Sequence, residues 1–276
     1  KFIDDNKEEP FFLFIPYVLP HAELLVPEDS IIQKFRGMYP EQPHHGTDSG
    51  PMFRKGGYCS QVYPHATFAA MVYRYDVYVG QIVAKLKELG LYDNTLIIFT
   101  SDNGPHREGG ADPEFFNSNG IYRGIKRDLY EGGIRVPMIA AWPGQIEEGT
   151  ISHQPCAFWD MMPTFAEVIH TKKAPECDGI SILPTLKGEK GQKQHDYFYF
   201  EFHEMNGRQA IIRGNWKLIL LDIQKSPKYE LYNIAADPSE VHNMIDRNPE
   251  KFAELKTLME QVHTKDTNWP LLPAEF

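Results

Sequence analysis

The sequence predicts an α/β fold in which a mainly parallel sheet is flanked by helices and is followed by a small antiparallel sheet with one helix. Apolar runs with the length of buried strands alternate with helical segments, as in chains that form parallel sheets. These runs lie at 10–17, 95–99 and 136–144. After about residue 190 the strand-like segments instead follow one another through short turns. We therefore expect a main α/β domain over residues 1–190 and a small α+β subdomain over residues 191–276.

The individual elements of the first domain follow from local patterns. The apolar run PFFLFIPY at 10–17 has the residue types of a strand covered on both faces. Residues 37–64 are rich in Gly, Pro and His, which indicates a long surface loop. From His65 to Leu89 apolar residues recur every three or four positions, which predicts one amphipathic helix ended by Gly90.

The remaining elements are expected nearer the C-terminus. AFWDMMPTFAEVIH, residues 157–170, has the pattern of a second helix. Strand-like pieces follow in YFYFEFHE, QAIIRGNWKLILLD and KYELYNIAADPSE, and a last helix is expected near 249–263.

Composition limits the classes of function. The chain has 276 residues and is 42% hydrophobic, which suffices for a substantial core. Its 28 basic and 38 acidic residues give a net charge of -10, which argues against a nucleic-acid partner. No run approaches the roughly 20 apolar residues that span a bilayer. The cysteines, Cys59, Cys156 and Cys177, form no CxxC pair, which argues against zinc and redox motifs.

Polar residues follow the apolar run at 95–99. In SDNG, Asp102 and Asn103 offer hard oxygen ligands that suit Ca²⁺ or Mg²⁺ rather than zinc. Asp, Asn and Gly are also the commonest turn formers, so SDNG taken alone equally predicts a simple turn. Because loops at the carboxyl ends of strands line the binding crevice of an α/β sheet, we expect His21, beyond the run at 10–17, to lie near Asp102.

A basic segment, YRGIKRDLYEGGIRVP at 122–137, is the second concentration of chemistry. Its cations are Arg123, Lys126, Arg127 and Arg135. Such cations bind phosphate or sulfate through charge-assisted hydrogen bonds, and neighbouring glycines allow close backbone approach. The alternative is a solvated loop whose charges are paired internally by Asp128 and Glu131.

The third concentration of chemistry is His21, with His106 as a companion. A histidine can protonate a leaving group or donate to an oxyanion. A single histidine in a loop is more often structural, and several others in the chain compete for the role.

Taken together and in this order, PFFLFIPYVLPHAELLVPE, LYDNTLIIFTSDNGPH, RGIKRDLYEGGIRVPMIAAWPG and FWDMMPTFAEV resemble the type I sulfatase family. This family is formylglycine-dependent and has an alkaline-phosphatase-like fold. The tail GNWKLILLDIQKSPKYELYNIAADPSE is similar to the C-terminal subdomain of that family. The resemblance covers almost the whole chain and implies a sulfuric ester hydrolase, with residues 1–190 as the C-terminal part of its catalytic domain.

The resemblance also implies roles for individual residues. Asp102 and Asn103 correspond to the acid and amide that bind the catalytic Ca²⁺. Lys126 corresponds to the lysine that holds the sulfate and assists the leaving oxygen, and His21 to a histidine that contacts the sulfate and is a candidate general acid. His106 and Arg107 lie where the family often contacts substrate, although Arg107 would also suit a salt bridge.

One part of the family pattern has no counterpart. The formylglycine nucleophile is made from Cys or Ser in a C/S-x-P-x-R motif, which no cysteine or serine of this chain matches. In the family this motif and the other metal-binding aspartates belong to the N-terminal half. The chain is therefore expected to be the C-terminal portion of a sulfatase, without turnover of its own.

Two other classes remain open. Phosphatases and phosphodiesterases of the same superfamily carry Asp-His where this chain has Asp102 and Asn103, and Asn is a poor zinc ligand. A non-catalytic module that binds sulfated glycans would lack the nucleophile motif in the parent protein as well. By resemblance to N-acetylgalactosamine and galactose sulfatases we expect a sulfated carbohydrate substrate and a periplasmic, secreted or lysosomal location.

Overall fold

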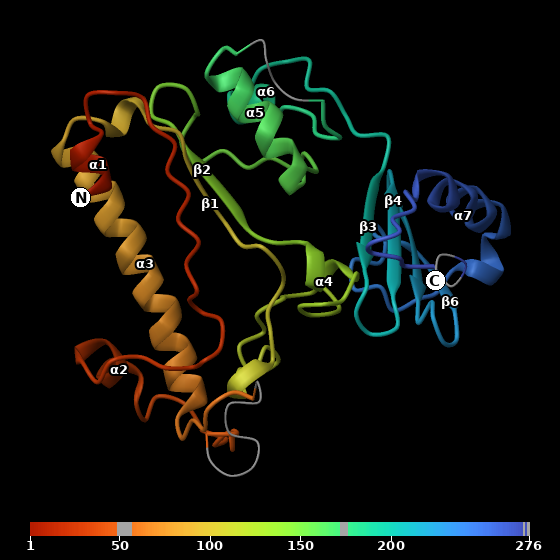
Figure 1. Ribbon diagram of the computed structural model, residues 1–276, viewed down its shortest axis with the longest axis horizontal. Coiled ribbons are helices and arrows are strands. Elements are labelled where there is room, and N and C mark those ends of the chain that lie inside the picture. The colour runs from red at the N-terminus through yellow and green to blue at the C-terminus, as the bar shows by residue number, and fades with distance from the viewer. Residues whose placement is uncertain (49–56, 172–175, 273, 275–276) are drawn as a thin grey trace. The chain divides into compact units, whose positions relative to one another are not determined.

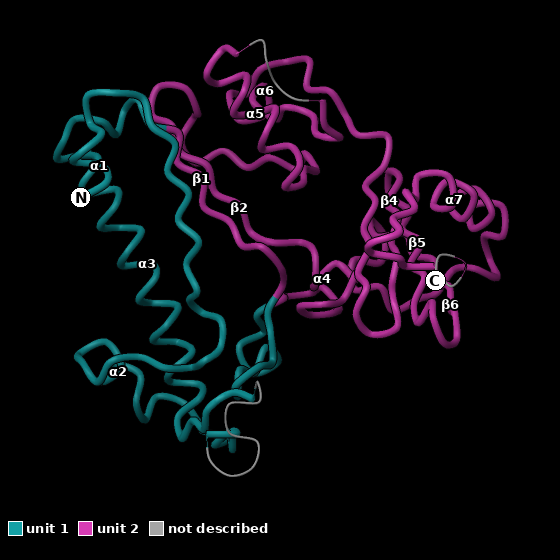
Figure 2. Tube along the Cα trace, viewed as in Figure 1, with its two compact units in different colours: residues 1–95, 105–118 teal, residues 96–104, 119–276 magenta. Residues whose placement is uncertain are grey.

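The computed structural model describes residues 1–48, 57–171, 176–272 and 274 (Figure 1). Contacts divide the chain into two compact units (Figure 2). Unit 1 consists of residues 1–95 and 105–118, and unit 2 of residues 96–104 and 119–276. Unit 2 includes both sides of the boundary expected at residue 190, and that boundary stays a prediction. Within the described ranges, every helix is too short or too polar to span a membrane.

Unit 1 is organised around one long helix, α3 (Pro64–Glu88), which confirms the helix predicted over 65–89 (Figure 1). Pro64 lies in the first turn, where its missing N–H leaves no hydrogen bond unmade. Gly90 follows the helix with a φ of 68°, which a glycine adopts without steric strain. The shorter elements are α1 (Phe2–Asp5), α2 (Ser30–Phe35) and helical turns at Tyr92–Asn94 and Glu108–Gly110.

Two small cores lie against α3. One contains Leu24, Met71 and Ala111, and the other contains Ile32, Ala66 and Ala70. Asp29 caps α2 by accepting the Ile31 N–H at 3.0 Å, and the same carboxylate binds the Arg74 guanidinium at 2.8 Å. The capping residue therefore also fastens α2 to α3.

The strand predicted at 10–17 is wrong: this segment is irregular, and in the described part of the chain it pairs with no strand. Phe12 and Phe14 are 69% and 73% exposed. A strand exists only where its backbone finds a hydrogen-bonding neighbour, which an apolar run does not provide by itself. The loop predicted at 37–64 is irregular in its described residues apart from a bridge between His44 and Gln61, and residues 49–56 lie outside them.

In unit 2, β1 (Ile97–Thr100) and β2 (Met138–Ala141) confirm two predicted strands. They pair antiparallel, with Thr100 opposite Met138, so the prediction of a mainly parallel sheet is wrong for the strands described. The chain leaves β1 at Thr100 and enters β2 beside the same residue, whereas a parallel pair needs a connection back to the other end of β1. The alternation of strand and helix signals does not determine this direction.

The small antiparallel sheet predicted after residue 190 is confirmed. Its strands lie in the order β3 (Phe198–Phe202), β4 (Arg208–Arg213), β5 (Trp216–Leu221) and β6 (Lys228–Asn233). The predicted C-terminal helix is α7 (Pro249–Val262). Because side chains alternate between the faces of a strand, Leu218 packs with Leu255 of α7, while Ile219 packs with Leu129 and Tyr130 on the other face.

The remaining elements of unit 2 are α4 (Glu131–Ile134), α5 (Met161–Val168), α6 (Leu183–Leu186) and helical turns at Phe158–Asp160 and Ile245–Arg247. α5 confirms the helix predicted over 157–170. The fully buried Asp160 carboxylate organises this region by accepting the N–H groups of Ala157 and Ile180, each at 2.8 Å. His195 Nε2 lies at the same distance from it.

Candidate functional site

The loop after β1 carries the predicted metal ligands. Asp102 is exposed, and among the described residues its carboxylate has no hydrogen-bond or ion-pair partner. Asn103 is half-buried, and its side-chain N–H donates to the Gly104 carbonyl at 3.0 Å. This bond uses the amide nitrogen, whereas Oδ1 accepts no hydrogen bond from the described residues. Two side chains with hard oxygens thus follow one another in a loop that bends at residues 102–104.

Two oxygen groups alone would not fill the coordination shell of a metal ion. Among the described residues no three His, Cys, Asp or Glu side chains gather closely enough to hold a metal ion. Ca²⁺ takes six to eight oxygen ligands. Asp102 and Asn103 therefore fit Ca²⁺ by the chemistry of their oxygens, as a fraction of its coordination shell.

α4 connects this loop to the basic segment within unit 2. The Gly104 N–H donates to the Gly133 carbonyl at 2.9 Å, and the Gly132 N–H donates to the Arg123 carbonyl at 2.7 Å. A Cβ on Gly104 would lie 1.9 Å from the Gly132 carbonyl oxygen. The glycines of YEGGIRVP are thus required because three backbone segments meet at α4.

The arginines of the basic segment have structural partners. Arg123 lies over the Tyr130 ring at 3.9 Å, and Arg135 pairs with Glu131 at 3.0 Å. Arg127 Nε lies 3.3 Å from a Glu204 oxygen. The internal pairing proposed as the alternative for this segment is therefore present at Arg135. Lys126 is half-buried in the same segment.

In unit 1 the structure brings the two candidate histidines together. The rings of His21 and His106 stack with centroids 5.2 Å apart. His21 Nδ1 lies 2.6 Å from the Ala22 carbonyl and His106 Nε2 lies 3.0 Å from the Pro20 carbonyl, so each of these nitrogens carries a proton. His106 Nδ1 is 3.0 Å from the Glu108 carboxylate. The His106 side chain is buried, so its ring contacts His21 and has little exposure to solvent.

Arg107 makes the salt bridge that the sequence left open: its guanidinium pairs with the Glu114 carboxylate. Both side chains are more than half exposed, and pairs in water are weak. Arg107 also lines a cavity of about 350 Å³ within unit 1. The other polar residues of this cavity are Gln42, His44, His65, Asp112 and Glu114.

Sequence reasoning missed several buried charged residues, among them Lys217 and Glu240, which are fully buried. Lys217 Nζ lies 2.9 Å from a carboxylate oxygen of Glu240 and 2.9 Å from one of Glu131. A signal exists in WKLILL, because Lys217 occupies the same strand face as the core residue Ile219. A cation at a core position of a strand indicates a buried partner.

Comparison with known proteins identifies the family. The sulfatase family model matches residues 1–171, and the model described as N-sulphoglucosamine sulphohydrolase, C-terminal, matches residues 120–267. The chain belongs to the type I sulfatase family.

Relatives include the N-acetylgalactosamine-6-O-sulfatase of Bacteroides thetaiotaomicron, which is 30% identical over 96% of this chain and 49% of its own length. The human steryl-sulfatase is 28% identical over 100% of this chain and 48% of its own length. Ps i-CgsB, solved in complex with k-i-k-neocarrahexaose, matches with a TM-score of 0.73 and 30% identity over 94% of this chain and 52% of that one. The chain spans about half the length of the curated relatives it matches.

Proposed function

We propose that the protein to which this chain belongs hydrolyses sulfate esters with the help of Ca²⁺, and that its formylglycine and further metal ligands lie outside this chain. One observation carries the proposal. In unit 2, α4 holds the Asp102 and Asn103 loop and the segment of Lys126 through backbone hydrogen bonds at Gly133 and Gly132. The hard oxygen ligands and the cation for the sulfate thus share one rigid support.

The residues have complementary roles in this reaction. The exposed Asp102 carboxylate and Asn103 Oδ1 would hold the metal, which when bound supplies positive charge to the sulfate oxygens. Lys126 would bind a sulfate oxygen and stabilise the leaving oxygen. His21, whose Nδ1 proton is held by the Ala22 carbonyl, would donate from Nε2 when protonated. His106 would orient His21 by stacking.

A carbohydrate is the substrate class we propose. The cavity of unit 1 combines Arg107 with the carboxylates of Asp112 and Glu114 and the imidazole of His44. Such groups suit sugar hydroxyls and sulfates better than an apolar ring system. By family resemblance we also propose that the protein acts in the periplasm, in a lysosome or after secretion.

Sulfate release by the full-length protein that contains this chain tests the proposal. We expect turnover of N-acetylgalactosamine-6-sulfate, loss of activity with a chelator, and recovery with Ca²⁺. Asn103→Ala should raise the Ca²⁺ concentration needed for half-maximal activity, because it removes one oxygen ligand. The exposed Asn117→Ala should leave this concentration unchanged. The chain alone should release no sulfate.

Other outcomes point elsewhere. Preferential hydrolysis of a phosphate ester by the full-length protein would favour the phosphatase alternative. Binding of the sulfated sugar without any turnover would favour a glycan-binding module.

A further inference from the structure

A buried ion cluster joins α4 to the C-terminal sheet. Lys217 of β5 has an exposed fraction of 0% and lies between the carboxylates of Glu131 and Glu240, at 2.9 Å from each. The second oxygen of Glu240 accepts the Glu131 backbone N–H at 2.6 Å. The second oxygen of Glu131 pairs with Arg135 at 3.0 Å. Two carboxylates that enter the core from different segments therefore meet on one ammonium group.

The electrostatics of the cluster depend on that ammonium. Burial raises the pKa of Glu240, and the charge of Lys217 opposes this shift. Without Lys217, two carboxylates would face each other in a buried site with Arg135 as the remaining cation. Removal of one partner from a buried ion pair is strongly destabilising, because the other charges stay buried without compensation.

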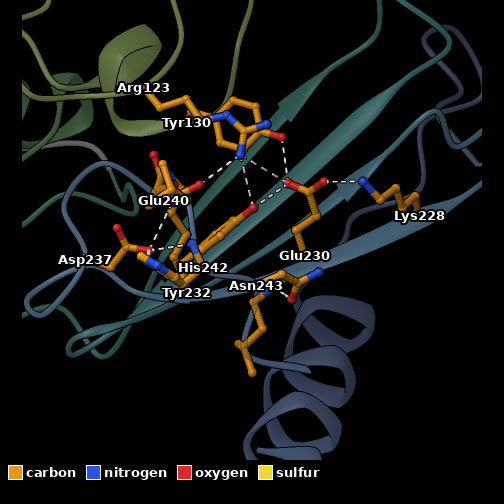
Figure 3. Close-up of polar contacts among 12 residues, drawn as sticks. Arg123, Tyr130, Lys228, Glu230, Tyr232, Asp237, Glu240, His242 and Asn243 are labelled. Atoms are coloured by element: carbon orange, nitrogen blue, oxygen red, sulfur yellow. Dashed lines mark hydrogen bonds and ion pairs between the residues drawn. The ribbon is translucent and has the colours of Figure 1, made fainter. Parts of the chain in front are cut away.

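Further hydrogen bonds connect the basic segment to Glu240 and to β6 (Figure 3). Arg123 donates to the Glu240 carbonyl at 2.8 Å and to Tyr232 Oη at 3.2 Å. The Glu230 carboxylate accepts from Tyr130 Oη at 2.6 Å and from Tyr232 Oη at 2.7 Å. Residues on both sides of Lys126 are therefore anchored to β6 and to Glu240.

The backbone of α4 transmits this anchoring to the metal-ligand loop. Gly132 donates to the Arg123 carbonyl, and Gly104 donates to the Gly133 carbonyl. A Cβ on Gly133 would lie 2.1 Å from the Asp128 carbonyl oxygen. Backbones packed this closely cannot slide past one another, so a shift of α4 moves Asp102 and the Lys126 segment together.

We propose that Lys217 and Glu240 are positioning residues for the sulfate site: by holding α4 on the C-terminal sheet they set the place of the Asp102 and Asn103 loop and of Lys126. The proposal rests on the proposed function for the meaning of that site. The coupling between the C-terminal sheet and the loop can be measured whether or not the protein has activity. It predicts that a change in the C-terminal sheet loosens a loop that the sheet itself does not contain.

Hydrogen exchange of the whole chain, followed by mass spectrometry, measures this coupling. Lys217→Met removes the ammonium, and Glu240→Gln removes one charge with little change in shape. We expect peptides over 101–104 and 122–135 to exchange about tenfold faster or more in both variants, while α7 and α3 keep wild-type protection. Lys256→Met is the matched control. Among the described residues this partly exposed lysine of α7 pairs only with Glu260, at 3.8 Å, and lies over the Tyr229 ring. The exchange rates of all peptides should be unchanged in this variant.

Two results would overturn the proposal: unchanged exchange at 101–104 in Glu240→Gln, or an equal rise over all of unit 2, which would indicate ordinary destabilisation. If Lys217→Met does not fold, Glu240→Gln alone decides. In the full-length protein we expect Glu240→Gln to lower kcat/KM about tenfold and to raise the Ca²⁺ concentration needed for half-maximal activity. A wild-type protein inactive on all sulfate esters would refute the proposed function, and the exchange experiment would still decide the positioning role.

Discussion

Replacement of Gly132 by alanine tests the close contact at α4 most directly. The added Cβ would lie 2.3 Å from the Gly124 carbonyl oxygen and 2.6 Å from that of Arg123, both below the 3.0 Å that real Cβ contacts respect. Both atoms belong to the backbone, so no side chain can rotate away. Overpacking of this kind costs about 1–3 kcal/mol. Displacement of the Gly132 N–H from the Arg123 carbonyl adds about 1 kcal/mol.

The expected loss for Gly132→Ala is therefore about 2–4 kcal/mol, a large part of the roughly 5–15 kcal/mol that stabilises a typical domain. The assay is urea unfolding followed by tryptophan fluorescence. All four tryptophans, Trp142, Trp159, Trp216 and Trp269, lie in unit 2, so the signal reports that unit alone.

Gly80→Ala provides the control. Gly80 lies inside α3 of unit 1, and a Cβ there meets no atom within 4 Å. Alanine should stabilise the helix by about 0.5–1 kcal/mol without moving the tryptophan transition. An unchanged tryptophan midpoint in Gly132→Ala would refute the reasoning on close backbone approach.

Three further predictions concern pH, thiol reactivity and the core. Burial alone would raise the pKa of Glu230, but hydrogen bonds from a lysine and two tyrosines outweigh burial and lower the pKa. The carboxylate therefore stabilises the fold above the unfolded-state pKa of about 4.3, and this contribution is lost on acidification. Urea midpoints between pH 3 and pH 7, roughly the range in which carboxylates titrate, should thus fall less steeply in acid for Glu230→Gln; identical acid limbs would contradict this. Partial burial, followed by the Glu23 carboxylate, raises the pKa of Cys59 to about 11, so roughly one thiol in a thousand is ionised near pH 8. Iodoacetamide should therefore label Cys59 far more slowly than the exposed Cys177. Equal labelling of the two, measured by mass spectrometry, would count against the raised pKa of Cys59. Leu255→Ala empties a fully buried position between α7 and the sheet and should cost about 2–5 kcal/mol in the same urea assay, against well under 1 kcal/mol for Ile169→Ala, whose side chain is 70% exposed.

Local patterns predicted the elements whose stability is itself local. The spacing of Phe68, Met71 and Val72 predicts α3, and Gly90 marks its end, because helical hydrogen bonds connect residues four apart. Strand pairing joins distant residues, so the sequence around Ile97 and Ala141 predicted two strands and not their antiparallel register. The composition of the run at 10–17 suits a strand, which is why a strand was predicted there. The prediction is wrong because a strand also needs a neighbour to pair with, and composition does not supply one.

The candidate site shows a similar limit. Residue types predicted a companion for His21, and the stacked His106 confirms their proximity. The same reasoning grouped Arg123, Arg127 and Arg135 with Lys126 as cations for an oxyanion, yet each arginine has a structural partner. Which of several cations is committed to the fold depends on Tyr130, Glu131 and Glu204, and their proximity is a property of the tertiary structure.

The pairing of Lys217 with Glu131 also determines how this chain can be divided. A truncation near residue 190 would remove Lys217 and leave Glu131, which is 3% exposed, without the ammonium group that compensates its burial. It would also uncover Leu129 and Tyr130, which pack on Ala210 and Ile219 of the sheet. The last third of the chain therefore cannot be removed or exchanged without effects on the segment before it. A chimera that grafts a different C-terminal sheet onto this protein would have to redesign residues 123–135 with it.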